Sequence, residues 1–387
     1  MRISVPFFGI DAVSVACKKN ALDHKSVNVL EVNPNLTNYL SALHGRPILP
    51  TDVLKIDYAT LEASEVLVCG PPCQPWARGG AGLGWLDERS KCMLAADEIA
   101  GALKRKGCLR AVCIENTPAI LESRKNGEAP MKVIQDKWAE EMPNWFPLQP
   151  WVLDGEAFCT PMMRTRAYLV SVPLAFKDIF NQSGDDGFFP MLAPPKRTGD
   201  PQWRLIDYLN YCAEGDGLTT DKIRGPKQKI YYEQWKETAY DALKQRPSNV
   251  AVVDGSRSPC GSFSTNLQFD RLPSCMTQNR NLFVFGDSTV VSKIPIGGRY
   301  LAVEERAKVM GFDCGGVLAK LTGNLTSPQL MIALGNTMLV NVVGAVLKQI
   351  WNYLAVVETG SPRLSLDDKP MTPMKRRPRE KSRPPML

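Results

Sequence analysis

Short apolar runs that alternate with helical stretches make up the first part of the chain. Strand-like runs occupy residues 3–8, 27–31, 66–69 and 111–116, and the second and fourth contain an acid at or near their ends. Helical periodicity follows the first run as far as Ala16 and the second as far as Tyr39. Because strands that alternate with helices form mainly parallel sheets covered by helices, the pattern predicts an α/β, doubly wound fold.

The pattern changes at about residue 173. Residues 181–200 are rich in Gly, Asp and Pro, and weak periodicity continues to residue 298. We therefore expect a first domain at 1–172 and a second, smaller and irregular domain at 173–298. Helical periodicity returns at 303–310 and 330–354, so residues 299–358 are expected to pack back on the first domain. Residues 359–387 form a Pro-rich basic tail with little to bury, which predicts disorder.

The apolar stretch at 338–357 is interrupted by Asn341, Lys348 and Asn352, which predicts a buried helix and no membrane partner. The composition, with 44% hydrophobic and 22% charged residues, is that of a globular protein. Most of the net charge of +7 lies in the tail, since residues 361–387 carry eight Lys or Arg and three Asp or Glu. This tail is either a nuclear import signal, a nonspecific DNA arm or a solvated terminus.

Eleven cysteines with irregular spacing and no signal peptide at Met1 predict reduced thiols and an intracellular protein. The expected location is the nucleus if the source is eukaryotic, and otherwise the cytoplasm or nucleoid. With only two histidines and no zinc-type cysteine spacing, the sequence predicts no metal site.

A proline-rich turn follows the third apolar run, with the sequence Gly70-Pro71-Pro72-Cys73-Gln74-Pro75-Trp76. Two prolines exclude a helix and stiffen the backbone, so the strand ends in a rigid turn that carries a thiol. In an α/β sheet, ligands bind at the carboxyl ends of the strands. The turn therefore predicts Cys73 as a nucleophile, and the alternative is a buried structural cysteine.

Seven further motifs accompany this turn in a fixed order. They are Phe7-Phe8-Gly9; Glu31 with Tyr39; Asp52; Glu115-Asn116; Pro161-Met162-Met163-Arg164-Thr165-Arg166; Arg299-Tyr300-Leu301-Ala302-Val303-Glu304-Glu305 with Met310-Gly311-Phe312; and Gly335-Asn336-Thr337, while Gly79, Gly84, Asp87 and Arg89 follow the cysteine turn. From about residue 5 to 350, the chain resembles the cytosine-C5 methyltransferases that use S-adenosylmethionine.

The resemblance implies a Rossmann-like mixed sheet, S-adenosyl-L-methionine as cofactor, double-stranded DNA as partner, and a monomer. It assigns catalytic roles to Cys73, Glu115, Arg164 and Arg166. It assigns the cofactor to Phe7, Gly9, Glu31, Asp52, Pro72 and Asn336, with Glu31 and Asp52 on the ribose and adenine. The substrate-binding residues that we expect are Gln74, Asn116, Arg257, Arg271, Thr277 and Arg280.

The residue types also suit this chemistry on their own. Carbon 5 of cytosine is a poor nucleophile, and addition of a thiolate at carbon 6 makes it enamine-like. Cys73 would need a lowered pKa or a nearby base to become that thiolate. A protonated Glu115 in an apolar pocket would relieve the charge at N3, although Glu115-Asn116 alone could be a helix cap or turn.

Two arginines are predicted to project from one face of a strand, because Arg164 and Arg166 are two residues apart. Such a face suits O2 of the base, the Glu115 carboxylate or a phosphate, and the alternative is a solvated strand face. In the second domain, residues 274–278 resemble the segment that holds the opened duplex. The glycines between residues 79 and 84 favour a loop that moves during base flipping, or else an ordinary surface loop.

Four departures from the family pattern stand out: Met162 replaces Gln, Asp11-Ala12 replaces Gly-Gly, Val5 replaces an acid and Thr117 replaces Val. Our main hypothesis is a DNA (cytosine-5-)-methyltransferase. The first rival is a tRNA methyltransferase, whose Cys-Phe-Thr signature is absent. The second rival is a catalytically silent relative that binds DNA or a protein partner.

Overall fold

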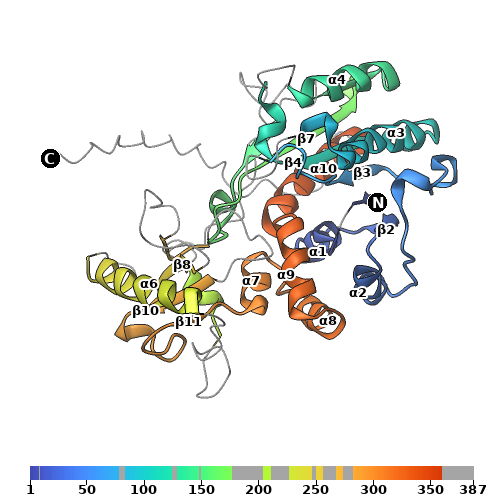
Figure 1. The fold of residues 1–387 in the computed structure, drawn as a ribbon. Coiled ribbons are helices and arrows are strands. Elements are labelled where there is room, and N and C mark those ends of the chain that lie inside the picture. Colours follow the sequence, from blue (N-terminus) through green and yellow to red (C-terminus); the bar gives the residue numbers. More distant parts are fainter. Residues whose placement is uncertain are drawn as a thin grey trace.

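The computed structural model describes residues 1–7, 9–77, 83–123, 129–147, 150–176, 204–210, 226–245, 250–255, 267–272 and 282–359. Within these residues the chain forms one seven-stranded and one four-stranded sheet (Figure 1). The larger sheet has the order β2-β1-β3-β4-β7-β5, and β6 also pairs with β7. Its strands are β1 (Arg2–Pro6), β2 (Lys25–Leu30), β3 (Val66–Cys69), β4 (Ala111–Asn116), β5 (Trp145–Pro147), β6 (Trp151–Leu153) and β7 (Arg166–Pro173).

The first four strands of the larger sheet are parallel, and β7 runs antiparallel to its neighbours. Every residue of β3 and β4 is buried. This is the burial expected of central strands that are covered on both faces, and it explains why they are continuous apolar runs in the sequence. The predicted α/β, doubly wound mixed sheet is confirmed.

The helices of the larger body pack in pairs, α1 with α10, α3 with α4 and α2 with α8. Their bounds are α1 (Ala12–Lys19), α2 (Pro34–His44), α3 (Lys91–Arg105), α4 (Pro130–Glu141), α7 (Val303–Val309), α8 (Val317–Asn324), α9 (Ser327–Asn336) and α10 (Val340–Thr359). Helix α10 packs against α1 of the first part of the chain. By length and composition Val340–Val357 could span a membrane, but 72% of that window is buried inside the protein.

The helical pattern at 330–354 is divided into two helices, because α9 ends at Asn336 and α10 begins at Val340. The break is stabilised from outside. Arg164 donates to the carbonyl oxygens of Gly335 at 3.1 Å and Thr337 at 2.6 Å. The N–H of Val340 donates to the carbonyl of Met310 at 3.0 Å. Periodicity could not reveal this break, since its cause lies in distant parts of the chain.

The second lobe is built on the smaller sheet, which is antiparallel with the order β11-β10-β8-β9. Its elements are β8 (Val250–Asp254), β9 (Leu267–Phe269), β10 (Leu282–Gly286), β11 (Arg299–Tyr300) and α6 (Pro226–Lys244). Tyr232 and Trp235 of α6 form a small core with Phe283 and Phe285. In Figure 1 this lobe stands apart from the larger sheet, with α7 between them.

This described part of the second lobe is more regular than the sequence suggested. Strands β8 and β10 are buried at every residue, so they show no alternation of polar and apolar positions. Strand β11 begins directly after the predicted boundary at residue 298, although it pairs with β10 of this lobe. The domain boundaries themselves stay predictions.

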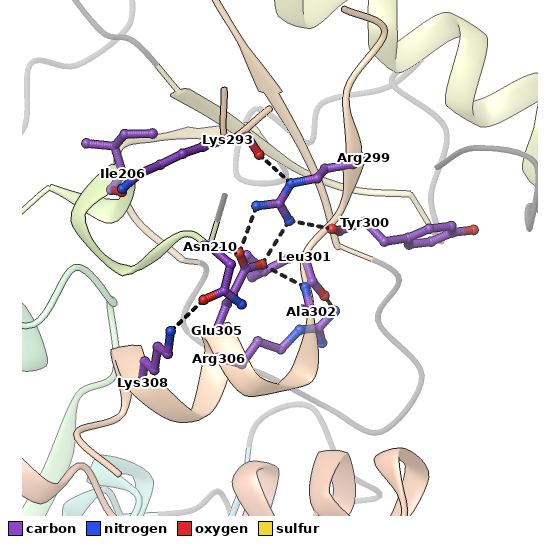
Figure 2. Close-up of polar contacts among 10 residues, drawn as sticks. All are labelled: Ile206, Asn210, Lys293, Arg299, Tyr300, Leu301, Ala302, Glu305, Arg306 and Lys308. Atoms are coloured by element: carbon purple, nitrogen blue, oxygen red, sulfur yellow. Dashed lines mark hydrogen bonds and ion pairs between the residues drawn. The ribbon is translucent and has the colours of Figure 1, made fainter. Parts of the chain in front are cut away.

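A buried ion pair joins the two parts of the molecule (Figure 2). Arg299 and Glu305, both fully buried, make two contacts of 2.7 and 2.9 Å. Glu305 also accepts from the backbone N–H of Asn210 at 2.7 Å and of Ala302 at 2.9 Å. Lys308 of α7 donates to the side-chain oxygen of Asn210 at 2.5 Å. One carboxylate therefore links β11, the segment 204–210 and α7.

A second contact between the lobes is made by backbone atoms near Met162. Met162 forms an isolated β-bridge with Leu272, and the N–H of Leu272 donates to the carbonyl of Pro161 at 2.8 Å. The Met162 side chain is fully buried in the main core. The thioether thus serves packing here, while the bridge to the second lobe uses the main chain and needs no side-chain amide.

Candidate active site

The turn after β3 is fixed by main-chain hydrogen bonds. The carbonyl oxygen of Cys73 accepts from the N–H groups of Trp76 at 3.0 Å and Ala77 at 2.9 Å. The buried side chain of Asn116, at the end of β4, donates to the carbonyl of Pro71 at 3.1 Å. Cys73 itself is half-buried. Its thiol therefore sits on a rigid turn and is still reachable from outside.

Aromatic packing supports the far side of this turn. Trp76 is buried, and its ring meets that of Trp85 edge-on with centroids 4.8 Å apart. The N–H of Gly84 donates to the carbonyl of Pro75 at 2.9 Å, and Arg89 forms a two-pronged ion pair with Asp87 at 2.9 and 2.7 Å. Residues 78–82, which include Gly79, lie outside the described residues.

Glu115 reaches the cysteine turn from the neighbouring strand. The register of β3 and β4 pairs Cys69 with Ile114, so Glu115 follows alongside Gly70. A Cβ atom placed on Gly70 would lie 3.3 Å from Oε2 of Glu115 and 3.0 Å from Cε of Met338. The missing side chain at Gly70 thus lets the carboxyl group approach the turn closely.

The electrostatics favour the neutral forms of both predicted catalytic groups. Burial raises the pKa of Glu115, although Arg166 and Arg164 oppose the effect. Burial also raises the pKa of Cys73. The nearby Glu115 raises that pKa further, whereas Arg166 and Arg164 lower it. Glu115 is therefore suited to donate a proton. Cys73 rests as a thiol, and both histidines lie elsewhere, His24 beside the carbonyl of Leu22 and His44 beside Asp11.

The two predicted arginines have different partners. Arg166 opens β7, which pairs with β4, and its Nε lies 3.1 Å from Oε1 of Glu115. Arg164 precedes the strand, so the prediction that both project from one strand is wrong for Arg164. Its buried guanidinium binds the carbonyls on either side of Asn336. Arg166 therefore contacts the carboxyl group, whereas Arg164 positions the Gly335–Thr337 segment.

Asn336 lies next to the cysteine turn. The side-chain nitrogen of Gln74 lies 3.3 Å from Oδ1 of Asn336, to which it donates. The other side-chain atom of Gln74, Oε1, is buried without a hydrogen-bond partner among the described residues. Gln74 thus connects the predicted substrate side to the predicted cofactor side.

Three predicted cofactor residues, Phe7, Gly9 and Glu31, lie at the carboxyl ends of β1 and β2. Glu31 accepts from the N–H groups of Gly9 at 3.0 Å and Asn33 at 2.8 Å. The N–H of Phe7 donates to the carbonyl of Leu30 at 3.0 Å. Burial raises the pKa of Glu31, against the opposing effect of these backbone hydrogen bonds. No atom lies within 4 Å of a Cβ placed on Gly9, so the turn is open on that side.

Asp52 belongs to the same edge, because the N–H of Thr51 donates to the carbonyl of Glu31 at 2.8 Å. Asp52 accepts from the N–H of Leu54 at 3.1 Å and pairs with Lys55 at 3.2 Å, and these interactions lower its pKa. Val32, which is 61% exposed, follows Glu31 directly. Sequence reasoning missed Val32, whose signal was an apolar residue immediately after the acid of a strand.

This edge fits a nucleoside. Carboxylates at Glu31 and Asp52 suit hydroxyl and amino groups, and the exposed Val32 suits an apolar ring face. Among the described residues there is no group of three or more His, Cys, Asp or Glu that could hold a metal ion.

The predicted nucleic-acid contacts are only partly described. Arg257, Thr277 and Arg280 lie outside the described residues. Arg271 follows β9, and its guanidinium contacts Glu156 at 2.6 Å and Gln268 at 3.0 Å. In this conformation Arg271 links the second lobe to the segment 155–158 of the catalytic body, and its contact with nucleic acid stays a prediction.

Comparisons with known proteins agree with this architecture. The family model described as C-5 cytosine-specific DNA methylase matches residues 6–352. The type II methyltransferase M.NlaX of Neisseria lactamica is 24% identical over 164 residues, which are 42% of this chain and 50% of that protein. The chain thus spans about half the length of this curated relative.

Solved structures are similar over nearly the whole chain. The S. pombe Dnmt2 methyltransferase has a TM-score of 0.60 at 15% identity, covering 92% of this chain and 99% of that one. EhMeth of Entamoeba histolytica has a TM-score of 0.55 at 14% identity, with 92% and 98% covered. A putative DNA modification methyltransferase of an E. coli prophage has a TM-score of 0.54 at 16% identity, with 92% and 99% covered. At these identities the likeness concerns the fold.

Proposed function

Because the chain belongs to the C-5 cytosine-specific DNA methylase family, whose methyl donor is S-adenosyl-L-methionine, we propose that it methylates carbon 5 of cytosine in double-stranded DNA. The observation that carries the proposal is that Glu115, near the end of β4, approaches the turn after β3 that carries Cys73, and that the two groups interact electrostatically. Arg166 lies on the carboxyl group of Glu115 at 3.1 Å. A thiol and a carboxylic acid in this arrangement suit addition to one side of a ring and protonation at another.

The proposed reaction begins with attack of the Cys73 sulfur on carbon 6 of the base. A bond forms between sulfur and carbon 6, the displaced electron pair moves toward N3, and Glu115 donates its proton there. Carbon 5 then carries enamine character and can attack an electrophilic methyl group. S-Adenosylmethionine supplies that methyl on a positively charged sulfur. Loss of the proton from carbon 5, departure of the Cys73 thiolate and return of the N3 proton to the Glu115 carboxylate then restore the neutral aromatic ring.

Thiolate formation is the step that the resting site does not favour, since burial raises the pKa of Cys73. Arg166 and Arg164 both favour the thiolate. When Glu115 gives its proton to the base, its carboxyl group becomes negatively charged. Arg166, whose Nε lies 3.1 Å from Oε1 of Glu115, stabilises that charge. We therefore assign Arg166 the role of compensating the charge that appears on Glu115 during addition.

The donor would lie at the edge formed by β1 and β2. Glu31 and Asp52 would accept hydrogen bonds from the ribose and adenine, Val32 would cover a ring face, and Phe7, Gly9, Pro72 and Asn336 would complete the site. The target base must reach Cys73 on its turn after β3, and a base within a stacked duplex cannot do so. Base flipping is therefore part of the proposal.

Trapping on a fluorinated base tests this function. With 5-fluorocytosine the fluorine cannot leave as a proton does, so the covalent complex persists. We expect the wild-type protein and Cys108→Ala, which alters another half-buried cysteine, to form a stable adduct with duplex DNA in the presence of the donor. Cys73→Ala should form none, and an adduct with this variant would refute the assignment.

The same assay distinguishes the substrates. Duplex DNA and tRNA, each carrying 5-fluorocytosine, are offered separately with labelled S-adenosylmethionine. An adduct only with tRNA would overturn DNA as the substrate while retaining the chemistry. Absence of any adduct, together with DNA binding, would support the catalytically silent alternative.

A further inference from the structure

The cofactor turn contains an aspartate where the family pattern has glycine. Asp11 has φ 46° and ψ 64°, in the left-handed region that glycine adopts most easily. Its side chain is fully buried. A buried carboxylate on a backbone of this kind is unfavourable unless specific partners hold it, so the turn requires an explanation.

Two partners hold the carboxylate. Oδ1 of Asp11 accepts from the N–H of Ser14 at 2.9 Å, which caps the start of α1. Oδ2 lies 2.9 Å from Nε2 of His44, the last residue of α2, whose side chain is 10% exposed. Burial alone would raise the pKa of Asp11, but the contacts with His44 and Ser14 outweigh it and lower that pKa. Asp11 is therefore an ionised carboxylate inside the protein.

Three other titratable groups lie near this pair, but none of them takes the place of His44 as the hydrogen-bonding partner of Asp11. Cys17 of α1, Tyr39 of α2 and His24 before β2 each interact electrostatically with Asp11. Burial raises the pKa of Cys17 and Tyr39, so both are neutral. The contact between Asp11 and His44 is thus the polar link between the start of α1 and the end of α2.

The same helix holds a second point of the turn. The hydroxyl of Tyr39 donates to the carbonyl of Ile10 at 3.3 Å. One residue earlier, the N–H of Gly9 donates to Glu31 at 3.0 Å. Three consecutive residues, 9–11, are therefore tied to β2 or α2. A shift of Asp11 would be passed directly to Gly9 and to the carboxylate that we assign to the donor.

We propose that Asp11 and His44 are a positioning pair that keeps the turn of residues 9–11 in the conformation that binds the methyl donor. Neither side chain needs to touch the donor. A glycine at position 11 would leave the turn free to change conformation, whereas the contact between Asp11 and His44 fixes it. The turn is therefore preorganised before the ligand binds. This inference rests on the proposed use of S-adenosylmethionine at this edge.

Binding of S-adenosylhomocysteine to the full-length protein, measured by calorimetry without nucleic acid, tests the pair. His44→Leu should weaken binding about tenfold, if only about a tenth of the molecules then hold the competent turn. His44→Gln, whose amide can donate from a similar position, should recover most of the affinity. His24→Leu changes the other histidine of the chain and should bind like the wild type.

Two further measurements separate positioning from a general structural role. Melting temperatures show whether each variant is folded at the temperature of the titration. For methyl transfer, His44→Leu should raise the KM for the donor and leave kcat at saturating donor within about twofold, because only the competent fraction changes. If His44→Leu does not fold, Asp11→Gly, which accepts the left-handed backbone and removes the anchor, should show the same tenfold loss.

The outcomes distinguish this inference from the function on which it rests. Wild-type affinity in a folded His44→Leu or Asp11→Gly variant would overturn the positioning pair while leaving the donor site intact. An equal loss in His24→Leu would overturn it as well, because the effect would then not be specific to His44. If the wild-type protein itself bound no S-adenosylhomocysteine, the donor assignment would fail, and the positioning pair with it.

Discussion

The two lobes hold their important residues in different ways. Around the large sheet, the contacts are made to the main chain: Asn116 binds the carbonyl of Pro71, and Arg164 binds two carbonyls beside Asn336. The small lobe is joined to α7 largely through the side chain of Glu305. The cysteine turn and the Asn336 segment are thus held through their main-chain carbonyls, whereas the joint at α7 depends on a buried side chain. The two can therefore be altered separately.

The sharpest way to test this separation is Glu115→Gln. The amide keeps the size of the side chain but cannot give a proton to the base, so we expect kcat to fall about 10²- to 10⁴-fold. Wild-type kcat should fall as pH rises through the raised pKa of Glu115, because the acid form is lost. The variant should lack this decline. Affinity for DNA should stay unchanged in a gel-shift titration, and Glu156→Gln serves as the control carboxylate.

A large loss of DNA affinity in Glu115→Gln, with kcat preserved, would contradict the division between lobes. It would mean that Glu115 acts mainly in holding the substrate.

The joint between lobes gives the next largest effect. Glu305→Gln leaves the buried Arg299 charge uncompensated, which costs about 3–5 kcal/mol of unfolding free energy when a buried pair is broken. Denaturant unfolding measures this loss. At temperatures where the variant is folded, the KM for DNA should rise more than kcat falls. Glu304→Gln, on the neighbouring and less buried position of α7, should change neither quantity.

If Glu305→Gln reduced kcat and left the KM for DNA unchanged, the joint would serve the chemistry, and the proposed separation would be lost.

The part of the molecule that the sequence could predict is the part built on strands. Cys73 and Glu115 follow or end continuous apolar runs, and parallel strands bring their carboxyl ends to one edge, so their meeting could be expected. Arg164 could not be placed, because its partners at Gly335 and Thr337 lie more than 170 residues away in the sequence. Such contacts arise from tertiary packing and leave no local pattern.

The second lobe shows the same limit. Its strands β8 and β10 are short and buried at every position, so they lack the alternation that marks a strand with one solvated face. Arg271 carried a predicted contact with nucleic acid, and the structure places its guanidinium against Glu156. The sequence can identify an arginine that could bind nucleic acid. Its acidic partner Glu156 belongs to the other lobe, so the ion pair becomes visible only in the folded structure.

A carboxyl group distant from both regions gives a third test. Asp97 of α3 is buried, which raises its pKa to about 7, against the effect of the hydrogen bond from Trp138. The folded protein thus retains a proton that the unfolded chain loses near its ordinary pKa, so stability should fall as pH rises from about 4 to 7. Asp97→Asn should remove this slope and gain on the order of 3 kcal/mol at pH 8.

Urea unfolding at a series of pH values measures the slope, and Glu98→Gln, its neighbour on α3, is the control. Methyl transfer by Asp97→Asn should match the wild type. An unchanged pH slope would show that Asp97 is not the group responsible, and a change in kcat would connect α3 to the chemistry.

The smallest expected effect comes from the outer part of the joint. Lys308→Met keeps the long apolar stem and removes the hydrogen bond to Asn210, while Glu305 retains its contacts with Arg299 and with the N–H of Asn210. The unfolding free energy should therefore drop by only about 1 kcal/mol, the usual net contribution of one such bond. The KM for DNA should rise slightly in the same direction as for Glu305→Gln. In a double-mutant cycle with Glu305→Gln the two losses should not add, because both variants loosen the segment 204–210. Full additivity would indicate that Lys308 and Glu305 stabilise different contacts, and that the joint at α7 is not a single unit.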